Sequence, residues 1–308
     1  RIGTASPGSL EGTRGRRGER IAMTASIREG RVDANGITFH FLEAGTGPLV
    51  LLLHGFPDNA WTWKHLIPDI AGAGFRAVAP FMRGYAPTEI PSQPFDTADV
   101  TEDIRALVDT LAGEPSYVVG HDWGALATLN VAALYPDVVR RAVSIGAGHP
   151  ATAVDIFKLP EQLHYAFHIW LFQLEGFGEF ALRHDDFALV DYLWQHWSSQ
   201  PVDRDHVVDV KKTLNEPGVV EAALAYYRGL VRVPTRKPEF FERVTQAISV
   251  PTLVVYGADD PAQAISRNEP QHYDGEYRRE LVDGSGHFVQ LERPDELTRL
   301  ILEWLRVD

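Results

Sequence analysis

Short apolar runs separated by helix-length segments are the feature that most constrains the fold of this chain. Four such runs occupy residues 48–53, 75–79, 116–119 and 142–145. They do not alternate between apolar and polar side chains, which is typical of strands in a parallel sheet that is covered on both faces. The alternation of strands with helices predicts right-handed crossovers in one α/β core.

A helical insertion is predicted to interrupt this core. After Gly146 the strand pattern stops, and the following hundred or so residues are rich in aromatic side chains at helical spacing. The strand pattern returns at residues 251–256 and 280–282, and Pro294 opens a last amphipathic helix. We therefore expect a core of residues 23–146 and 246–308 and a cap domain, or lid, of residues 147–245.

The amino end has two parts. Residues 1–22 are rich in Gly, Ser and Arg, which indicates a disordered tail or a translated upstream segment, and Met23 resembles a natural start. Beyond it, Asn35-Gly36 interrupts an alternating stretch, and this dipeptide favours the tight turn of a hairpin. Two antiparallel edge strands are therefore expected before the parallel ones.

The composition excludes several classes of function. A net charge of −13 without a long basic run argues against nucleic acid or an anionic membrane as partner. The absence of cysteine excludes disulfides, thiolate zinc sites and a cysteine nucleophile. No stretch approaches the roughly 18–20 apolar residues of a membrane span, so we expect a soluble protein, cytoplasmic by default. Its oligomeric state, monomer or homodimer, is left open.

A nucleophile elbow is predicted at Gly120-His121-Asp122-Trp123-Gly124, which follows an apolar strand and precedes a helix. Asp122 stands where esterases of this architecture carry serine. A carboxylate is a weak nucleophile toward an ester carbonyl, but it can displace a strained or good leaving group at saturated carbon. Epoxides and alkyl halides are such substrates. The simpler alternative is that Asp122 only caps the following helix.

Three further motifs follow predicted strands. His54-Gly55-Phe56-Pro57 is expected to face the elbow, so that the backbone N–H groups of Phe56 and Trp123 form an oxyanion hole. Asp260, preferred over Asp259, and then His287 complete the chain order nucleophile, acid, base. Their alternatives are a turn residue before a proline and a satisfied loop histidine.

Together these motifs resemble the epoxide hydrolases of the α/β-hydrolase superfamily, over residues 30–308. The resemblance rests on the His54, Asp122, Asp260 and His287 motifs and on Arg83-Gly84-Tyr85. It implies a mostly parallel eight-stranded sheet with helices on both faces and an inserted helical cap. It also implies hydrolysis without a metal or organic cofactor.

Members of that family resemble one another in two cap tyrosines that hold the epoxide oxygen and donate a proton. Tyr227 resembles the second, whereas the spacing from Phe172-Gln173 places His168 at the first position. A histidine ring N–H can donate the same hydrogen bond. His164 and Tyr165 are the fallback candidates, and simple packing of aromatic cap residues is the alternative.

The expected substrate is a small apolar epoxide, bound by Trp123, Tyr227, His168 and Trp170 and converted to a vicinal diol. Two dehalogenase families resemble this chain in the elbow. Haloalkane dehalogenases carry asparagine where this chain has Phe56, and haloacetate dehalogenases carry arginines where it has Trp123 and Leu126. Both differences favour an epoxide. A ligand-binding member of the fold without catalysis is the remaining alternative.

Overall fold

The protein is built on one eight-stranded sheet. The structure, a computed structural model, describes residues 25–152 and 160–306, so the expected tail of residues 1–22 lies outside it. The strand order is β1-β2-β4-β3-β5-β6-β7-β8. Strands β1 and β2 are antiparallel to their neighbours, and the other pairs are parallel, which confirms the predicted sheet. The strands are Arg28–Ala34, Ile37–Gly45, Leu49–Leu53, Arg76–Pro80, Ser116–His121, Val139–Ile145, Thr252–Gly257 and Tyr277–Val282.

The apolar runs become the centre of the sheet. Every residue of β3, β5 and β7 is buried. At the edge, Asn35 and Gly36 both have positive φ, and Ala34 pairs with Ile37, so the predicted two-residue hairpin joins β1 to β2. Burial on both faces explains why the central strands need no polar alternation.

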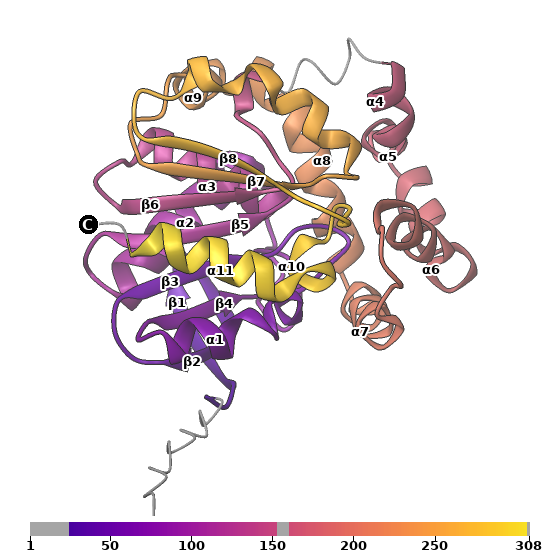
Figure 1. Ribbon diagram of the computed structural model, residues 1–308. Coiled ribbons are helices and arrows are strands. Elements are labelled where there is room, and N and C mark those ends of the chain that lie inside the picture. Colours follow the sequence, from indigo (N-terminus) through magenta and orange to yellow (C-terminus); the bar gives the residue numbers. More distant parts are fainter. Residues whose placement is uncertain (1–24, 153–159, 307–308) are drawn as a thin grey trace, which may run out of the picture.

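Helices cover both faces of the sheet, with α11 in front of it and α2 and α3 behind it in Figure 1. Contacts between α2 and α3, and between α1 and α11, hold each layer together. The core helices are α1 Leu66–Gly72, α2 Thr97–Leu111, α3 Trp123–Leu134, α10 Val289–Glu292 and α11 Pro294–Leu305, with 3-10 helices at Ala60–Trp63 and Pro261–His272.

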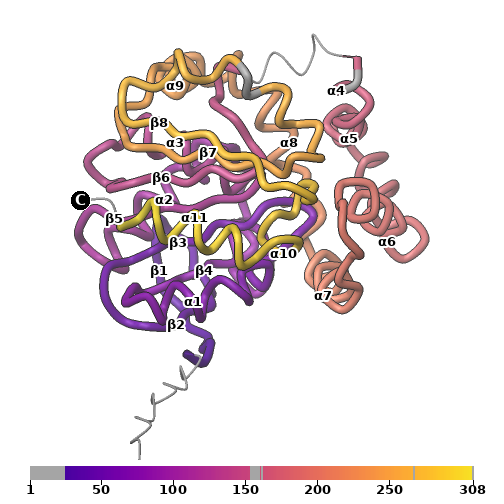
Figure 2. The backbone as a smooth tube through the Cα atoms, viewed as in Figure 1, coloured from indigo at the N-terminus to yellow at the C-terminus, as the bar shows by residue number. Residues whose placement is uncertain are grey.

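The cap lies between β6 and β7 in the sequence. Figure 2 shows the chain leaving the sheet after β6 and returning to it at β7, which is the neighbour of β6. The helices of this segment are α4 Pro160–Tyr165, α5 Phe167–Leu171, α6 Phe177–Trp197, α7 Arg204–Asn215, α8 Val219–Arg236 and α9 Pro238–Val244. Helices α4 to α8 lie to one side of the core (Figure 1), whereas α9 packs against α3.

Hydrogen bonds fix the cap on the loops that follow the strands. The indole N–H of Trp194, on α6, donates to the carbonyl of Pro57 at 2.8 Å. His206, on α7, bonds through Nε2 to Asp58 Oδ1 at 2.7 Å. The backbone N–H of His287 donates to the carbonyl of Trp197 at 2.8 Å. The cap is therefore anchored beside the loops that carry the predicted site.

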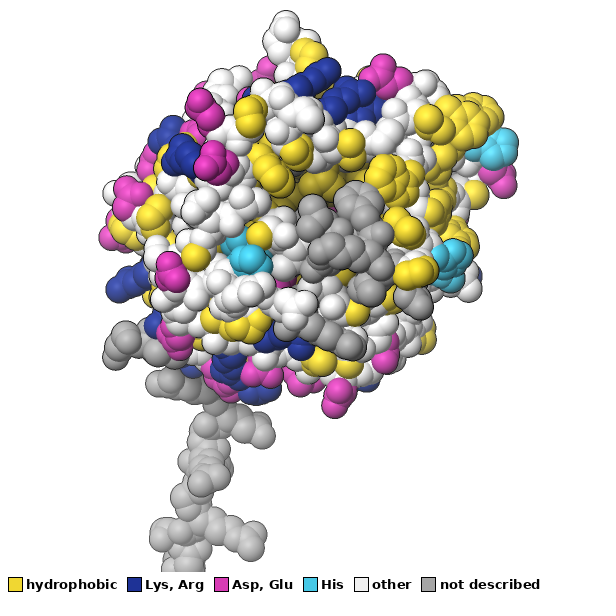
Figure 3. Space-filling view, turned by 90° about the horizontal axis from the view of Figure 1, so that it is seen from above, with side chains coloured by type: hydrophobic (Ala, Val, Ile, Leu, Met, Phe, Trp, Pro, Cys, Tyr) yellow, Lys and Arg dark blue, Asp and Glu magenta, His cyan; other side chains and the backbone are white. Residues whose placement is uncertain are grey.

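On the face drawn in Figure 3, apolar side chains gather over the cap and around a hollow. Phe177 and Phe180 of α6 are among the most exposed large apolar side chains, at 53% and 60%. Within residues 25–152 and 160–306, no helix combines the length and the apolar character of a membrane span.

Candidate active site

The turn between β5 and α3 has the geometry of a nucleophile elbow. Asp122 is held at φ 52° and ψ −113°, a conformation that costs a non-glycine residue about 1–3 kcal/mol. A Cβ at Gly120 would lie 2.0 Å from the carbonyl oxygen of Gly124, and one at Gly124 would lie 2.3 Å from that of Leu53. Both flanking glycines are therefore required for the strained turn that presents the Asp122 side chain.

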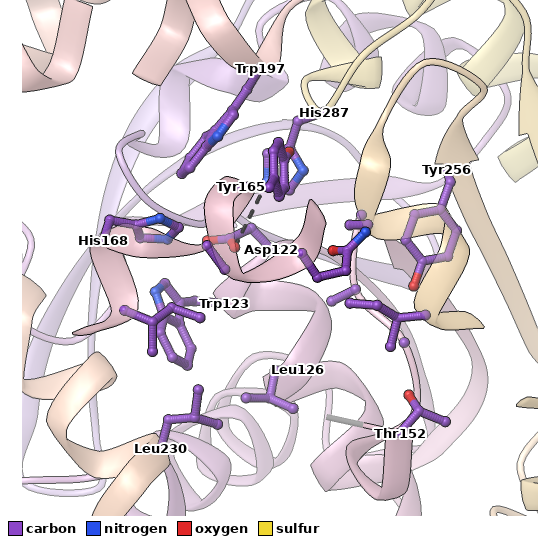
Figure 4. Close-up of a pocket in the computed structure, with 18 of the residues that line it drawn as sticks. Asp122, Trp123, Leu126, Thr152, Tyr165, His168, Trp197, Leu230, Tyr256 and His287 are labelled. Carbon is purple, nitrogen blue, oxygen red and sulfur yellow. Dashed lines mark ion pairs between the residues drawn. The ribbon is translucent and has the colours of Figure 1, made fainter. Parts of the chain in front are cut away.

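His287 and Asp260 lie beside this turn. Nδ1 of His287 is 2.9 Å from Asp260 Oδ2, and Nε2 of the same ring is 3.8 Å from Asp122 Oδ2. Figure 4 marks this second pair with a dashed line. Donation from Nδ1–H to the carboxylate leaves the Nε2 lone pair facing Asp122. Asp259, the alternative acid, does not make this bond, so the structure brings together Asp122, Asp260 and His287.

Burial and charge set the pKa values of the first two groups. Burial raises the pKa of Asp122, and His287 and the backbone of Phe56 and Trp123 oppose this. Burial lowers the pKa of His287, but Asp260 and Asp122 outweigh it, so the net pKa is raised. The Asp122 side chain is 25% exposed, whereas that of Asp260 is fully buried. Asp122 therefore meets the cavity, and Asp260 acts behind the histidine.

The loop after β3 holds one oxygen of the nucleophile. The backbone N–H of Phe56 donates to Asp122 Oδ1 at 2.8 Å. A Cβ at Gly55 would lie 2.4 Å from Asp122 Oδ1, so only glycine allows this approach. With Oδ1 engaged, Oδ2 is the oxygen free to attack. Oδ1 would become the carbonyl oxygen of an ester, already bound to a donor of the predicted oxyanion hole.

His54 keeps this loop in place. Its Nδ1 lies 3.0 Å from the carbonyl of Gly55, and its Nε2 accepts the backbone N–H of Met82 at 3.0 Å. Burial lowers the pKa of His54 to about 4, so the ring is neutral at physiological pH. The histidine of this motif therefore serves the loop rather than the chemistry.

Asp122 opens into a cavity of about 160 Å³ under the cap. Figure 4 shows His168, Trp123 and Trp197 around the same space as Asp122 and His287. Other residues that line the cavity have no predicted role: Gly146, Ala147, Gly148, Pro150, Thr152, Gln162, Ala166, Ile169, Leu230, Tyr256, Ala262 and Ile265. They come from segments far apart in the sequence, and no motif marks them.

Two predicted cap residues reach this cavity. The ring of Tyr227 lies 4.8 Å from that of Trp123 and 5.3 Å from that of His168, between centroids. Burial and Asp122 raise the pKa of Tyr227 well above its usual value. Burial and His287 lower the pKa of His168 to about 3, so this ring is neutral at physiological pH and can donate a hydrogen bond through one N–H group. A hydrogen bond between this ring and the backbone of Tyr165 opposes the fall in its pKa.

Trp170 does not fulfil its predicted role. It is 41% exposed and is not among the residues that line the cavity. Trp170 follows His168 by two residues on α5, and two residues of a helix turn by about 200°. Because His168 faces the cavity, Trp170 faces away from it, and the prediction that it binds substrate is wrong.

The two fallback candidates for the first cap donor, His164 and Tyr165, also differ in their position relative to the cavity. His164 is exposed and lies near His196, with 6.4 Å between ring centroids. Tyr165 lines the cavity, but its hydroxyl donates to Asp260 Oδ1 at 3.0 Å rather than standing free. A contact between this cap residue and the predicted acid, Asp260, is not foreseen from the sequence.

The lining of the cavity bears on the rival chemistries. None of the described residues that line it is arginine or lysine. Leu126, which does line it, stands at one of the two positions where haloacetate dehalogenases carry arginine. A substrate carboxylate would therefore lack a cationic partner here. Within the part of the chain that the structure describes, no group of three or more His, Asp or Glu side chains could hold a metal ion.

The chain is similar in sequence to a family of hydrolases. The family described as alpha/beta hydrolase fold matches residues 48–294. The AB hydrolase superfamily protein YfhM of Bacillus subtilis (strain 168) is 31% identical, over 89% of this chain and 96% of that protein. Epoxide hydrolase A of Mycobacterium tuberculosis is 30% identical, again over 89% of this chain and 96% of the relative.

Solved structures resemble it over nearly their whole length. Epoxide hydrolase A from Mycobacterium thermoresistibile matches with a TM-score of 0.79 at 27% identity, covering 91% of this chain and 98% of that one. Cfl2 from Burkholderia cenocepacia matches with a TM-score of 0.80 at 25% identity, covering 91% and 96%. Coverage of this extent includes the cap as well as the sheet.

Proposed function

Because this chain belongs to the α/β-hydrolase fold family, and within it to the epoxide hydrolases, we propose that it adds water to an epoxide and releases a vicinal diol. One observation carries the proposal. Asp122 Oδ2 faces the cavity 3.8 Å from His287 Nε2, while Oδ1 is bound to the Phe56 N–H. This arrangement suits a carboxylate that is alkylated first and then released by water.

In the first step, Asp122 Oδ2 attacks a ring carbon and the carbon–oxygen bond of the epoxide breaks. Tyr227 gives its proton to the departing oxygen, and a ring N–H of His168 donates a hydrogen bond to it. The raised pKa of Tyr227 supports this role, because the phenol stays protonated until charge develops on that oxygen. The result is an alkyl ester on Asp122.

In the second step, His287 Nε2 takes a proton from water, which attacks the ester carbon. The negative charge that forms on Oδ1 is stabilised by the N–H groups of Phe56 and Trp123. Asp260 stabilises the imidazolium through the 2.9 Å bond to Nδ1. When the tetrahedral species collapses, the diol oxygen leaves with a proton from His287, which restores the neutral histidine. The second proton of the water passes from the Asp122 carboxyl group to the Tyr227 phenolate, so the Asp122 carboxylate and the Tyr227 phenol are restored as well.

The cavity favours an apolar epoxide. Leu126, Ile169 and Leu230 form part of its wall, and no described lining residue carries a positive charge. Binding therefore depends on burial of apolar surface, with orientation set by Tyr227 and His168.

Halide displacement is the second candidate, because Trp123 offers a suitable donor. Its indole Nε1–H is buried and interacts with the Tyr227 hydroxyl, where it opposes the rise in the Tyr227 pKa. An N–H group next to the nucleophile could bind a halide leaving group. Phe56, however, supplies only its backbone N–H to the site, and that group is already bound to Asp122 Oδ1.

A parallel assay separates the two reactions. Purified protein is incubated with styrene oxide, with chloroacetate and with a 1-haloalkane, and both diol and free halide are measured. We expect diol from styrene oxide, no halide above the background of Asp122→Asn, and no diol from that variant. Halide release without diol formation would reverse the assignment.

A further inference from the structure

Among the residues that the structure describes, three hydrogen-bond donors surround the buried carboxylate of Asp260, and one comes from the cap. Oδ2 accepts from His287 Nδ1 at 2.9 Å, and Oδ1 accepts from the backbone N–H of Ala262 at 2.8 Å. The third donor is the hydroxyl of Tyr165, 3.0 Å from Oδ1. Tyr165 is the last residue of α4, so a cap helix completes the shell of the catalytic acid.

A second bond joins the same helix to the same turn. The side-chain amide of Gln162 donates to the carbonyl of Pro261, the residue after Asp260. Helix α4 also packs against the 3-10 helix Pro261–His272 that begins there. Helix α4 is therefore bonded to the Asp260–Pro261 turn through two acceptors, the carbonyl of Pro261 and the carboxylate of Asp260.

The Tyr165 hydroxyl has a defined electrostatic role. Asp260 is 1% exposed, and a buried carboxylate is costly unless donors compensate its charge. A hydrogen bond to an ionised acceptor is stronger than one between neutral groups. Burial and Asp260 raise the pKa of Tyr165 well above its usual value, so the phenol stays protonated and remains a donor at physiological pH.

Because its hydroxyl is bonded to Asp260, Tyr165 differs in role from the groups that would hold the epoxide oxygen. A phenol has one proton to donate, and here it is directed at Oδ1. The hydroxyl therefore acts on the acid behind His287 and not on the leaving oxygen. This differs from the proton-donor role for which Tyr165 is only a fallback candidate.

We propose that Tyr165 is a positioning residue for hydrolysis of the ester: its hydroxyl fixes the Asp260 carboxylate on His287 and makes this alignment depend on a docked cap. The inference rests on the proposed function and extends it. Attack on the epoxide uses Asp122 with Tyr227 and His168, so that step does not require Tyr165. Only the water-activating step uses the Asp260–His287 pair as an acid–base unit.

Tyr165→Phe tests this with the shape of the side chain preserved. Single-turnover kinetics with styrene oxide measure alkylation and ester hydrolysis separately, and intact mass shows the alkylated fraction during turnover. We expect hydrolysis to slow about tenfold or more, alkylation to change less than about twofold, and the alkylated fraction to rise. The ratio kcat/KM depends on binding and alkylation alone, so it should stay nearly unchanged. Slower hydrolysis should therefore lower kcat and KM by the same factor.

Tyr192→Phe is the matched control, since Tyr192 is a cap tyrosine that is 44% exposed and away from the cavity lining. It should leave both steps unchanged. A Tyr165→Phe variant with unaltered hydrolysis, or with both steps slowed equally, contradicts the inference. Loss of alkylation alone would make Tyr165 a proton donor to the epoxide instead.

The two proposals fail in different ways. If the wild-type protein forms no ester with the epoxide, the proposed function is wrong. If the wild-type protein turns over and Tyr165→Phe behaves like Tyr192→Phe, only the positioning role is wrong.

Discussion

Asp122 Oδ2 and His287 Nε2 face each other across 3.8 Å, and among the described atoms this nitrogen has no hydrogen-bond partner. The separation is too long for a direct hydrogen bond, but it places the base beside the carbon that would become an ester. In this position, His287 could activate a water molecule that enters after the ester on Asp122 has formed. In the proposed mechanism, the nucleophile and the base therefore act in successive steps.

Replacing the base should trap the intermediate. In His287→Gln, Asp122 still attacks the epoxide, but no group removes a proton from water. We expect the intact mass to increase by the mass of one substrate molecule, and peptide mapping to place the increment on Asp122. In Asp122→Asn with the same epoxide, no increment is expected. A His287→Gln protein that stays unmodified would contradict the covalent route.

Removal of the cap donor should slow the first step instead. Tyr227→Phe lacks the proton for the departing oxygen, and general-acid help of this kind contributes roughly 10²–10⁴-fold to a rate. We expect single-turnover alkylation by styrene oxide to fall within that range. His168→Phe should have a smaller effect, because a neutral ring supplies a hydrogen bond and not a proton.

The neighbouring Tyr226→Phe is the control for this series. Its hydroxyl donates to the carbonyl of Arg83 at 2.9 Å and is not part of the cavity lining. Its loss should lower the free energy of unfolding by about 1 kcal/mol, leaving alkylation unaltered. Equal loss of alkylation in Tyr226→Phe and Tyr227→Phe would argue against a specific donor.

Local sequence predicts the parts of this site that local geometry determines. The glycines around Asp122 are required by close backbone approaches, so the motif itself implies the turn. Asp260 and His287 follow β7 and β8, and parallel strands bring their carboxyl ends to one edge of the sheet. These residues could be placed together without knowledge of the cap.

The cap residues could not be placed in this way. Trp170 and His168 lie on one short helix, and only the docking of α5 decides which of them faces Asp122. The partner of Tyr165, Asp260, is 95 residues away, so no local pattern connects them. The aromatic character of residues 147–245 predicts a cap, whereas the direction of each side chain depends on packing between helices.

The two steps should differ in their dependence on pH. Alkylation requires the ionised form of Asp122, whose pKa is raised from 3.8, so its rate should fall with decreasing pH around a midpoint above that value. Hydrolysis requires the neutral form of His287, whose pKa is raised from 6.5, so its rate should fall as pH drops through a midpoint above 6.5. Single-turnover measurements from pH 4 to 9 test this. Coincident midpoints would mean that one group controls both steps.

Glu269 should make stability depend on pH near neutrality. It is fully buried beside the cavity wall, where its Oε1 accepts the backbone N–H of His149 at 2.7 Å. Burial raises its pKa from 4.5 to about 7. A raised pKa favours the folded state most below pH 4.5, and this contribution is lost as pH rises through about 7, because the buried group must then ionise.

Glu269→Gln keeps the acceptor for His149 and removes the charge. We expect it to raise the free energy of unfolding by about 1–3 kcal/mol at pH 8 and to change it little at pH 4.5. Chemical denaturation at the two pH values measures the difference, with Glu303→Gln, at an exposed position on α11, as the control. A gain of equal size at both pH values would show that the charge of Glu269 is not its cause.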